Sequence, residues 1–245
     1  MEGKNVRWKV WRPWYMKIVE RLGLDPKADL EASKVLDGNL PEPNIAELKK
    51  LIYAKDCVVL GAGPSLEEDL KKLESKGWMD KSFISADGAT SALLKYRTPD
   101  IVVTDLDGNV RDQFKAWERG SWLVLHGHGD NLDKIRKVAP QIDVRVLGTT
   151  QVEPFGKLFN FGGFTDGDRA AFMAHELGAS RIYLVGMDIG AKIGKYSGAK
   201  DLKRKIVKLS TCKELLAWLA GDFGAKLINL TAKGENIPNV PREAP

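Results

Sequence analysis

From about residue 46 onward, short apolar runs rich in β-forming residues alternate with stretches of helical periodicity. The apolar runs are CVVLG (57–61), SFISA (82–86), IVVT (101–104), WLVLH (122–126), VRVLG (144–148), RIYLVG (181–186) and KLINL (226–230). Helices are expected at about 66–76, 89–96, 111–118, 131–138, 167–178 and 206–221. Strands that are apolar throughout are buried on both faces, and an intervening helix favours parallel pairing. The alternation therefore predicts an α/β fold with a doubly wound, mostly parallel sheet.

The first 45 residues follow a different pattern. Apolar side chains recur there at steps of three or four residues, which predicts helix; they are Trp8, Trp11, Trp14, Ile18 and Leu22. We expect an N-terminal helical segment at 1–45, with LPEPN (40–44) as its linker, and an α/β domain that carries the site at 46–245. The tryptophan stripe packs either on this domain or on a second subunit, which leaves a homodimer open.

Composition narrows the class of protein. The chain has 245 residues, 43% of them hydrophobic, and a net charge of +5, so it can bury a sizeable core and suits a polyanionic ligand. Its two cysteines, Cys57 and Cys212, exclude a disulfide scaffold and favour the cytoplasm. No run reaches 18 apolar residues and no secretory signal is recognised, so no membrane contact is expected. Scarce glutamine with abundant lysine and glutamate is typical of a thermophile.

Glycine and aspartate gather where the predicted strands end and helices begin. The segments are GAGPSL (61–66), ADGAT (86–90), TDLDGN (104–109), HGHGDN (126–131), FTDGDRAA (164–171) and MDIG (187–190). Five of the six contain both aspartate and glycine. Asp-Gly is ordinary turn chemistry, but ligands of parallel sheets bind beyond the carboxyl ends of the strands. The repetition at one edge therefore predicts a binding site.

The GAGPSL segment is a candidate phosphate site. Gly61 and Gly63 allow a tight turn after a strand, and Ser65 with Glu68 has the spacing of a capping box. A helix N-terminus would then point into the loop, where exposed N–H groups favour phosphate. A plain strand-to-helix turn explains the residues equally well.

The same segment partly matches a dinucleotide-binding fingerprint, with Asp87 as the acid at the end of the next strand. Pro64 interrupts that pattern, and Leu66 stands where its third glycine belongs. NAD binding is therefore the weaker interpretation.

Two aspartate pairs are candidate metal ligands. Asp105 and Asp107 follow a buried strand, and an extended chain would direct both side chains to the same side. Asp166 and Asp168 repeat the spacing before a helix rich in alanine. Hard carboxylate oxygens that leave room for water and phosphate suit Mg²⁺. The alternative is that these aspartates only form turns and helix caps.

The HGHGDN segment resembles the start of the HxHxDH motif of metallo-hydrolases. His126, His128 and Asp130 match, but Asn131 replaces the final histidine, and His175 is the one other histidine in the chain. A dinuclear zinc site needs more nitrogen ligands than these. We therefore expect His126 and His128 to bind substrate or phosphate instead.

Six motifs in order resemble those of the archaeal 6-hydroxymethyl-7,8-dihydropterin pyrophosphokinase family. They are GAGPSL, TDLDGN, HGHGDN, GTTQ, GGFTDGDRA and LVGMDIG, within residues 57–230. ADGAT, PDIVVTDLDG and FTDGDRAA are also similar to the ADGGAN, PD…GDxDS and TDxxKA motifs of thiamin pyrophosphokinase. The resemblance implies a Rossmann-like, thiamin pyrophosphokinase-like sheet.

The resemblance leaves two alternative activities. One is thiamin pyrophosphokinase, but Gly108 stands where its GDxDS motif has serine, and Arg169 or no residue replaces the lysine of TDxxKA. The other is a nucleotide-sugar glycosyltransferase, because Maf proteins, which modify flagellin, are distantly similar. Maf proteins usually carry large extra domains, for which this chain has only about 45 residues to spare.

The pterin resemblance implies Mg²⁺-dependent transfer of diphosphate from ATP to a pterin alcohol, with AMP as the second product. Asp105, Asp107, Asp166 and Asp168 are then expected to hold Mg²⁺, and Asp130 to join them in catalysis. Asp87, Asp130 or Asp188 would orient the hydroxyl or pair with the pterin N–H groups. The residues expected to bind nucleotide or substrate are Gly61, Gly63, Pro64, Ser65, Asp87, Gly88, His128, Asn131, Thr165, Lys192 and Lys195. Carboxylates brought this close repel, so at least one should have a raised pKa without metal.

The segment 191–210 holds seven basic residues and one acid, Asp201. It either closes over a triphosphate or forms a solvated face of the protein. An RNA-binding patch is the weaker interpretation because Tyr196 is its one aromatic residue. Nucleic acid is therefore an unlikely partner.

Overall fold

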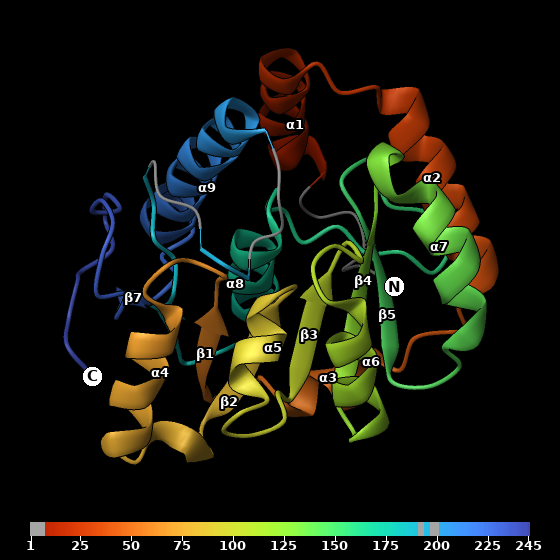
Figure 1. The fold of residues 1–245 in the computed structure, drawn as a ribbon. Coiled ribbons are helices and arrows are strands. Elements are labelled where there is room, and N and C mark those ends of the chain that lie inside the picture. The colour runs from red at the N-terminus through yellow and green to blue at the C-terminus, as the bar shows by residue number, and fades with distance from the viewer. Residues whose placement is uncertain (1–7, 191–193, 197–200) are drawn as a thin grey trace.

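A computed structural model describes residues 8–190, 194–196 and 201–245. Its centre is a seven-stranded sheet in which all neighbouring strands within this part of the chain pair in parallel, in the order β5-β4-β3-β2-β1-β6-β7 (Figure 1). The strands are β1 (Asp56–Leu60), β2 (Ser82–Ala86), β3 (Ile101–Thr104), β4 (Trp122–Gly127), β5 (Val146–Thr150), β6 (Arg181–Val185) and β7 (Leu227–Asn229). The predicted α/β fold with a parallel sheet is confirmed.

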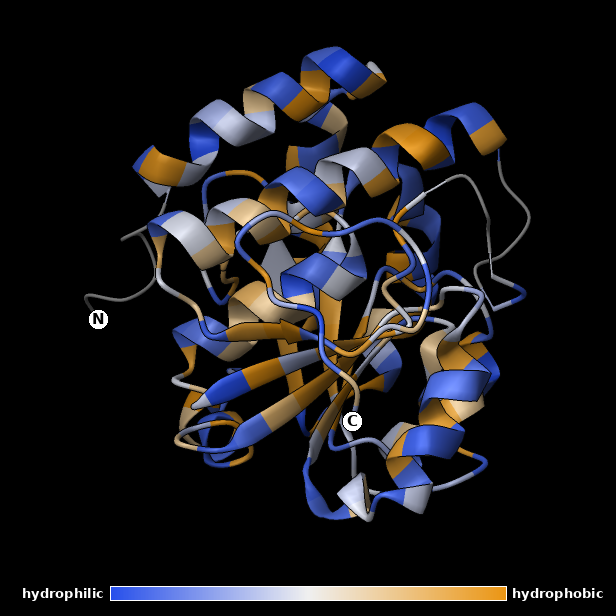
Figure 2. Ribbon diagram, turned by 90° about the vertical axis from the view of Figure 1, so that its left-hand side faces the viewer, coloured by the Kyte–Doolittle hydropathy of each residue, from blue (hydrophilic) through white to orange (hydrophobic). Residues whose placement is uncertain are grey.

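Helices cover both faces of this sheet. Those longer than a single turn are α1 (Trp8–Leu22), α2 (Pro26–Asn39), α3 (Ile45–Lys50), α4 (Leu66–Ser75), α5 (Ala89–Leu93), α6 (Val110–Glu118), α7 (Leu132–Val138), α8 (Asp166–Glu176) and α9 (Leu202–Asp222). Figure 2 shows apolar strands enclosed between helices whose outer faces are largely hydrophilic. The hydrophobic effect therefore holds a three-layer arrangement together.

Alternate residues of each strand point into opposite layers. In β1, Cys57 and Val59 join the cluster with α1, α8 and α9, whereas Val58 and Leu60 join the cluster with α4 and α5. Farther along the sheet, a third cluster packs α2, α6 and α7 against β3, β4 and β5. The doubly wound arrangement follows from this burial on both faces.

Two elements begin two or more residues away from their predicted starts. The fifth strand begins at Val146, because Arg145 before it has a φ of 47° and Val144 is exposed. A residue in the left-handed region cannot continue a strand. Helix α9 begins at Leu202, because the Asp201 side chain accepts hydrogen bonds from the backbone N–H groups of Lys203 and Arg204.

The tryptophan stripe of α1 packs in the same hydrophobic cluster as the sheet, α8 and α9. Trp11 is buried, and its Nε1 donates to the Gln151 carbonyl oxygen (2.9 Å). Trp14 contacts Trp218 of α9, with ring centroids 5.4 Å apart. Helix α2 lies against α7 and β5 (Figure 1), and LPEPN (40–44) connects it to α3.

Among the described residues, no helix combines the length and the apolar character needed to cross a membrane. Both cysteines are free and buried.

Candidate active site

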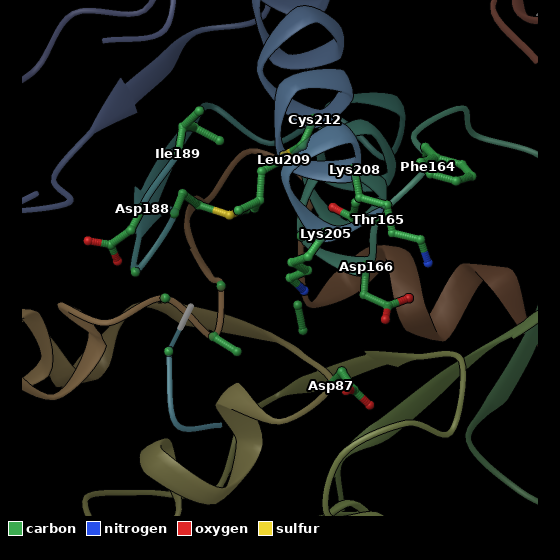
Figure 3. Close-up of a pocket in the computed structure, with 18 of the residues that line it drawn as sticks. Asp87, Phe164, Thr165, Asp166, Asp188, Ile189, Lys205, Lys208, Leu209 and Cys212 are labelled. Carbon is green, nitrogen blue, oxygen red and sulfur yellow. The ribbon is translucent and has the colours of Figure 1, made fainter. Parts of the chain in front are cut away.

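The carboxyl ends of β1, β2, β3 and β6 open into one cavity. Its walls come from the loops after these strands, from the start of α8 and from the N-terminal half of α9. Strand order changes direction between β1 and β6, which is where open parallel sheets place their ligands. Figure 3 shows Asp87 and Asp166 directed to one side of this cavity, and Ile189 at the opposite side.

Three carboxylates converge at the end of this cavity nearest β3. Asp87 follows β2, Asp105 follows β3, and Asp166 is the first residue of α8. One oxygen atom from each lies within 4.8 Å of the others. This acidic cluster brings together the first aspartate of each of the two pairs predicted to meet, although about sixty residues of sequence separate them.

The backbone and its neighbours hold Asp87 in place. Asp87 has a φ of 45°, in the left-handed region, and its Oδ1 accepts hydrogen bonds from Gln113 Nε2 (2.7 Å) and Thr104 Oγ1 (3.1 Å). Sequence reasoning expected Asp87 to contact substrate and did not place it in the cluster. Its position after a buried strand was the available signal.

A buried arginine faces the cluster. Arg169 is 4% exposed, and its guanidinium donates to Asp166 Oδ1 (2.7 Å) and to the Phe164 carbonyl oxygen (2.9 Å). Arg169 also lies one turn along α8 from Asp166, so the helix itself aligns the pair. This arginine supplies part of the positive charge that the clustered carboxylates require.

Burial and the repulsion that Arg169 does not offset raise the pKa values of two of these carboxyl groups. Burial and then the neighbouring Asp105 raise the pKa of Asp87 to about 6. The same two causes raise the pKa of Asp166 well above its usual range, while Arg169 opposes the shift. The expectation that at least one carboxyl has a raised pKa is confirmed.

The cluster fits a divalent cation. Three carboxylate oxygens in reach of one another form a hard donor set, and the open cavity beside them leaves positions for water or phosphate oxygens. A bound cation would also relieve the repulsion that raises the pKa values of Asp87 and Asp166.

The second aspartate of each pair lies elsewhere. Asp107 lines the cavity and forms an ion pair with Lys134. Asp168 is fully buried and accepts hydrogen bonds from the N–H groups of Phe164 and Thr165 (both 2.8 Å) and from the Thr165 hydroxyl. Asp168 and Thr165 therefore form a capping box at the start of α8. This is the role in turns and helix caps that the sequence left open as the alternative to metal binding.

The GAGPSL segment differs from its predicted role. Ser65 forms no capping box; its N–H (3.1 Å) and hydroxyl (2.9 Å) both lie against Asp188 Oδ2. Glu68 instead pairs with Lys72 and Lys233 on the surface. The N–H and hydroxyl of Ser65, which were expected to bind phosphate, thus contact carboxyl groups of the protein.

The glycines of this segment allow the loop after β6 to pack closely against it. A Cβ at Gly61 would lie 2.6 Å from Met187 Sδ, and one at Gly63 would lie 2.1 Å from Asp188 Oδ2. The exposed Pro64 sits in the turn before α4. Gly88 has a similar role, since a Cβ there would lie 2.0 Å from the Tyr196 carbonyl oxygen.

The HGHGDN segment supports the cluster from the β4 side. His128 Nε2 lies 3.2 Å from Asp105 Oδ2, and Asn131 Nδ2 donates to the carbonyl oxygens of Asp105 (2.8 Å) and His126 (2.7 Å). His126 is buried, with Nδ1 against Thr149 Oγ1 (3.1 Å), and burial depresses its pKa well below the usual range. Asp130 is exposed and pairs with Arg204 (3.2 Å).

A second cavity adjoins the first. It shares the walls formed by Asp105, Asp107, Lys205 and Lys208, and adds His128, Asp130, Asn131, Asp201 and Arg204. Lys195 pairs instead with Glu67 on α4 (2.6 Å), and Lys192 falls outside the described residues.

Sequence reasoning missed the apolar wall of the first cavity. Met187 and Ile189 follow β6 and line the cavity, as does Leu209, which projects from α9 (Figure 3). The signal for the first two was their place in MDIG, directly after a buried strand. Nothing in the local sequence marked Leu209, because α9 reaches the cavity through tertiary packing alone.

Comparison with known proteins places the chain in a family. The family model described as 6-hydroxymethylpterin diphosphokinase MptE-like matches residues 34–194. A protein named 6-hydroxymethyl-7,8-dihydropterin pyrophosphokinase from Pyrococcus furiosus is 44% identical over 236 residues, covering 92% of this chain and 100% of that protein. Proteins of the same name from Methanothermobacter thermautotrophicus (42% identical; 86% of this chain, 94% of that protein) and Methanocaldococcus jannaschii (37% identical; 86% and 95%) are also similar. The chain belongs to the MptE-like 6-hydroxymethylpterin diphosphokinase family, as its six ordered motifs predicted.

Proposed function

We propose that the protein transfers diphosphate from ATP to 6-hydroxymethyl-7,8-dihydropterin, giving the pterin diphosphate and AMP, with Mg²⁺ required. The names of the three relatives support the pterin substrate and the transfer. The observation that carries the proposal is the cluster of Asp87, Asp105 and Asp166, with one oxygen of each within 4.8 Å of the others. Diphosphoryl transfer depends on neutralising phosphate charge and aligning two substrates, which such a cluster serves.

In this reaction the hydroxymethyl oxygen forms a bond to the β-phosphorus of ATP. The bond between that phosphorus and the oxygen bridging to the α-phosphate breaks, AMP leaves with the electron pair, and the proton of the alcohol is lost to water. Mg²⁺, held by Asp87, Asp105 and Asp166, would neutralise phosphate charge.

The residues around the cluster have supporting roles. Arg169 fixes Asp166 through a buried ion pair, and His128 and Asn131 fix Asp105 and its backbone. Lys205 and Lys208 of α9 line both cavities beside the cluster, where they would contribute positive charge near the phosphates.

Separation of the nucleotide products tests this proposal. Purified protein with ATP, Mg²⁺ and 6-hydroxymethyl-7,8-dihydropterin should release AMP in equal amount with the pterin diphosphate. ADP as the sole nucleotide product would instead indicate an ordinary kinase. Omission of the divalent cation should abolish turnover, and full activity in excess chelator would contradict the metal requirement.

Substrate exchange tests the alternatives. Thiamin in place of the pterin should give little product, and a nucleotide sugar should give no transfer to the pterin. Faster turnover with thiamin would reassign the enzyme to the thiamin pyrophosphokinases.

A further inference from the structure

The acidic cluster lies where two cavities of different character meet. The first cavity lies between β1 and β6 and extends away from the cluster toward Ile189 (Figure 3). The second lies on the side of β4 and the start of α9. Two such cavities give two substrates separate approaches to the acidic cluster.

The far end of the first cavity is unsuited to phosphate. The N–H of Ser65 at the start of α4 donates to Asp188 Oδ2 (3.1 Å), and its hydroxyl lies within hydrogen-bond distance of the carboxyl groups of Asp69 (2.6 Å) and Asp188 (2.9 Å). Oδ1 of Asp188 is buried, and no hydrogen-bond partner for it occurs among the described residues. A phosphate group placed there would meet a buried carboxylate rather than free N–H donors.

Apart from Asp188, the walls of this end are apolar and closely packed. Met187 lies between two glycines: a Cβ at Gly61 or Gly167 would come within 2.6 Å of its Sδ or Cε. Ile189 is 4% exposed, and Leu209 of α9 projects toward the same space (Figure 3). Such walls suit a flat, uncharged heterocycle.

The second cavity has the opposite character. Three described lysine and arginine side chains line it: Lys205 and Lys208, which also line the first cavity, and Arg204, which does not. Of its aspartates, Asp105 and Asp107 are shared with the first cavity, whereas Asp130 accepts from the Arg204 side chain and Asp201 from the N–H groups of Lys203 and Arg204. Three cationic side chains beside a carboxylate cluster suit a polyphosphate that carries a metal ion.

We infer that the two cavities divide the substrates: the pterin ring binds in the first, against Met187, Ile189 and Leu209, and the nucleotide phosphates bind in the second, beside Arg204. This division rests on the proposed function, and it specifies the side of the acidic cluster from which each substrate approaches. The hydroxymethyl group then reaches the cluster from the β6 side, and AMP leaves toward the β4 side.

Binding of each ligand alone tests this division without turnover. Leu209→Ala should weaken binding of the pterin alcohol, followed by its fluorescence, about tenfold, and leave binding of a non-hydrolysable ATP analogue within twofold. Ile206→Ala is the matched control, because Ile206 is an exposed residue of the same helix that does not line either cavity. It should leave both affinities within twofold.

The second cavity is tested in the same way. Arg204→Gln should weaken binding of the ATP analogue about tenfold, measured by calorimetry with Mg²⁺ present, and leave pterin binding within twofold. Lys203→Gln removes a neighbouring exposed charge that lines neither cavity and should change neither affinity.

The results separate this inference from the proposed function. Weakened ATP binding in Leu209→Ala with unchanged pterin binding, or the reverse pattern in Arg204→Gln, would overturn the division even if the wild-type enzyme makes AMP. Wild-type protein that binds both ligands as described but makes no AMP would overturn the proposed reaction and leave the division standing. Wild-type protein that does not bind the pterin would overturn both.

Discussion

The loop after β3 and the first turn of α8 carry the same Asp-x-Asp spacing, yet they use it differently. In each pair the first aspartate, Asp105 or Asp166, joins the acidic cluster, and the second does not. After β3 the chain reverses at Leu106, which has a φ of 65° and is buried, so Asp107 points toward Lys134. Side chains two residues apart share a face only where the backbone is extended.

At α8 the backbone is helical instead. Successive side chains there are about 100° apart, so Asp166 and Asp168 diverge by roughly 200°. Asp166 faces the cavity, while Asp168 turns back to the N–H groups of Phe164 and Thr165. Identical spacing therefore predicts which aspartates enter the same cluster only when the local backbone conformation is known.

The largest expected effect comes from the first aspartate of the helical pair. Asp166→Asn should lower kcat/KM on the order of 100-fold or more, because it removes a charged oxygen from the cluster. Its melting temperature without metal reflects two opposing changes, the relief of repulsion with Asp105 and the loss of the buried ion pair with Arg169, and is measured to confirm that the variant is folded. Asp133→Asn, in an exposed carboxyl outside both cavities, is the control. Near-normal turnover and undiminished Mn²⁺ affinity in Asp166→Asn would remove Asp166 from the metal site.

Asp107 should have an intermediate effect. Asp107→Asn leaves the three carboxylates of the cluster intact but removes a charge from the wall that both cavities share. We expect turnover to fall roughly tenfold, in the range seen when groups beside a metal site are removed. Lys134→Met, which removes the ion-pair partner alone, should have a smaller effect on turnover. A loss in Asp107→Asn as great as that in Asp166→Asn would make Asp107 a ligand.

Asp168 should affect stability more than chemistry. Asp168→Ala removes the acceptor of two backbone N–H groups at the start of α8 and should lower the free energy of unfolding by about 1–2 kcal/mol. Denaturant titration measures this change. At a temperature where the variant is folded, Mn²⁺ affinity should stay close to that of the wild type. A lost Mn²⁺ site in a fully folded Asp168→Ala protein would restore Asp168 to the metal ligands.

The smallest effect concerns pH. The pKa of Asp87 is about 6 in the folded protein against 3.8 as its ordinary value, so between these pH values the folded state binds a proton that the unfolded chain has released. Asp87 therefore contributes less to stability as pH rises through this window. Without metal, raising the pH from 4.5 to 7 should lower the melting temperature of the wild type relative to that of Asp87→Asn. Equal differences in the two proteins would contradict the shift.

Local patterns in the sequence determined the α/β class, the seven strands and the edge of the sheet at which the site lies. Apolar runs of four to six residues can satisfy both faces of a strand only inside a layered sheet, so their alternation with helices leaves few other folds. The order of six short motifs also identified the family, because motif order does not depend on knowing the structure. The packing of Trp11 and Trp14 in the same hydrophobic cluster as the sheet was likewise one of two predicted outcomes.

Tertiary structure alone decided which of the polar residues at that edge act together. Asp87 entered the cluster because β2 and β3 are neighbours and its backbone adopts a left-handed conformation, neither of which its local sequence specifies. The N–H and hydroxyl of Ser65, predicted to bind phosphate, instead contact Asp188, which lies 123 residues away in the sequence. Leu209 became a cavity wall because α9 packs across the sheet edge. Sequence spacing describes contacts along one element, whereas contacts between elements depend on how the whole chain buries its apolar surface.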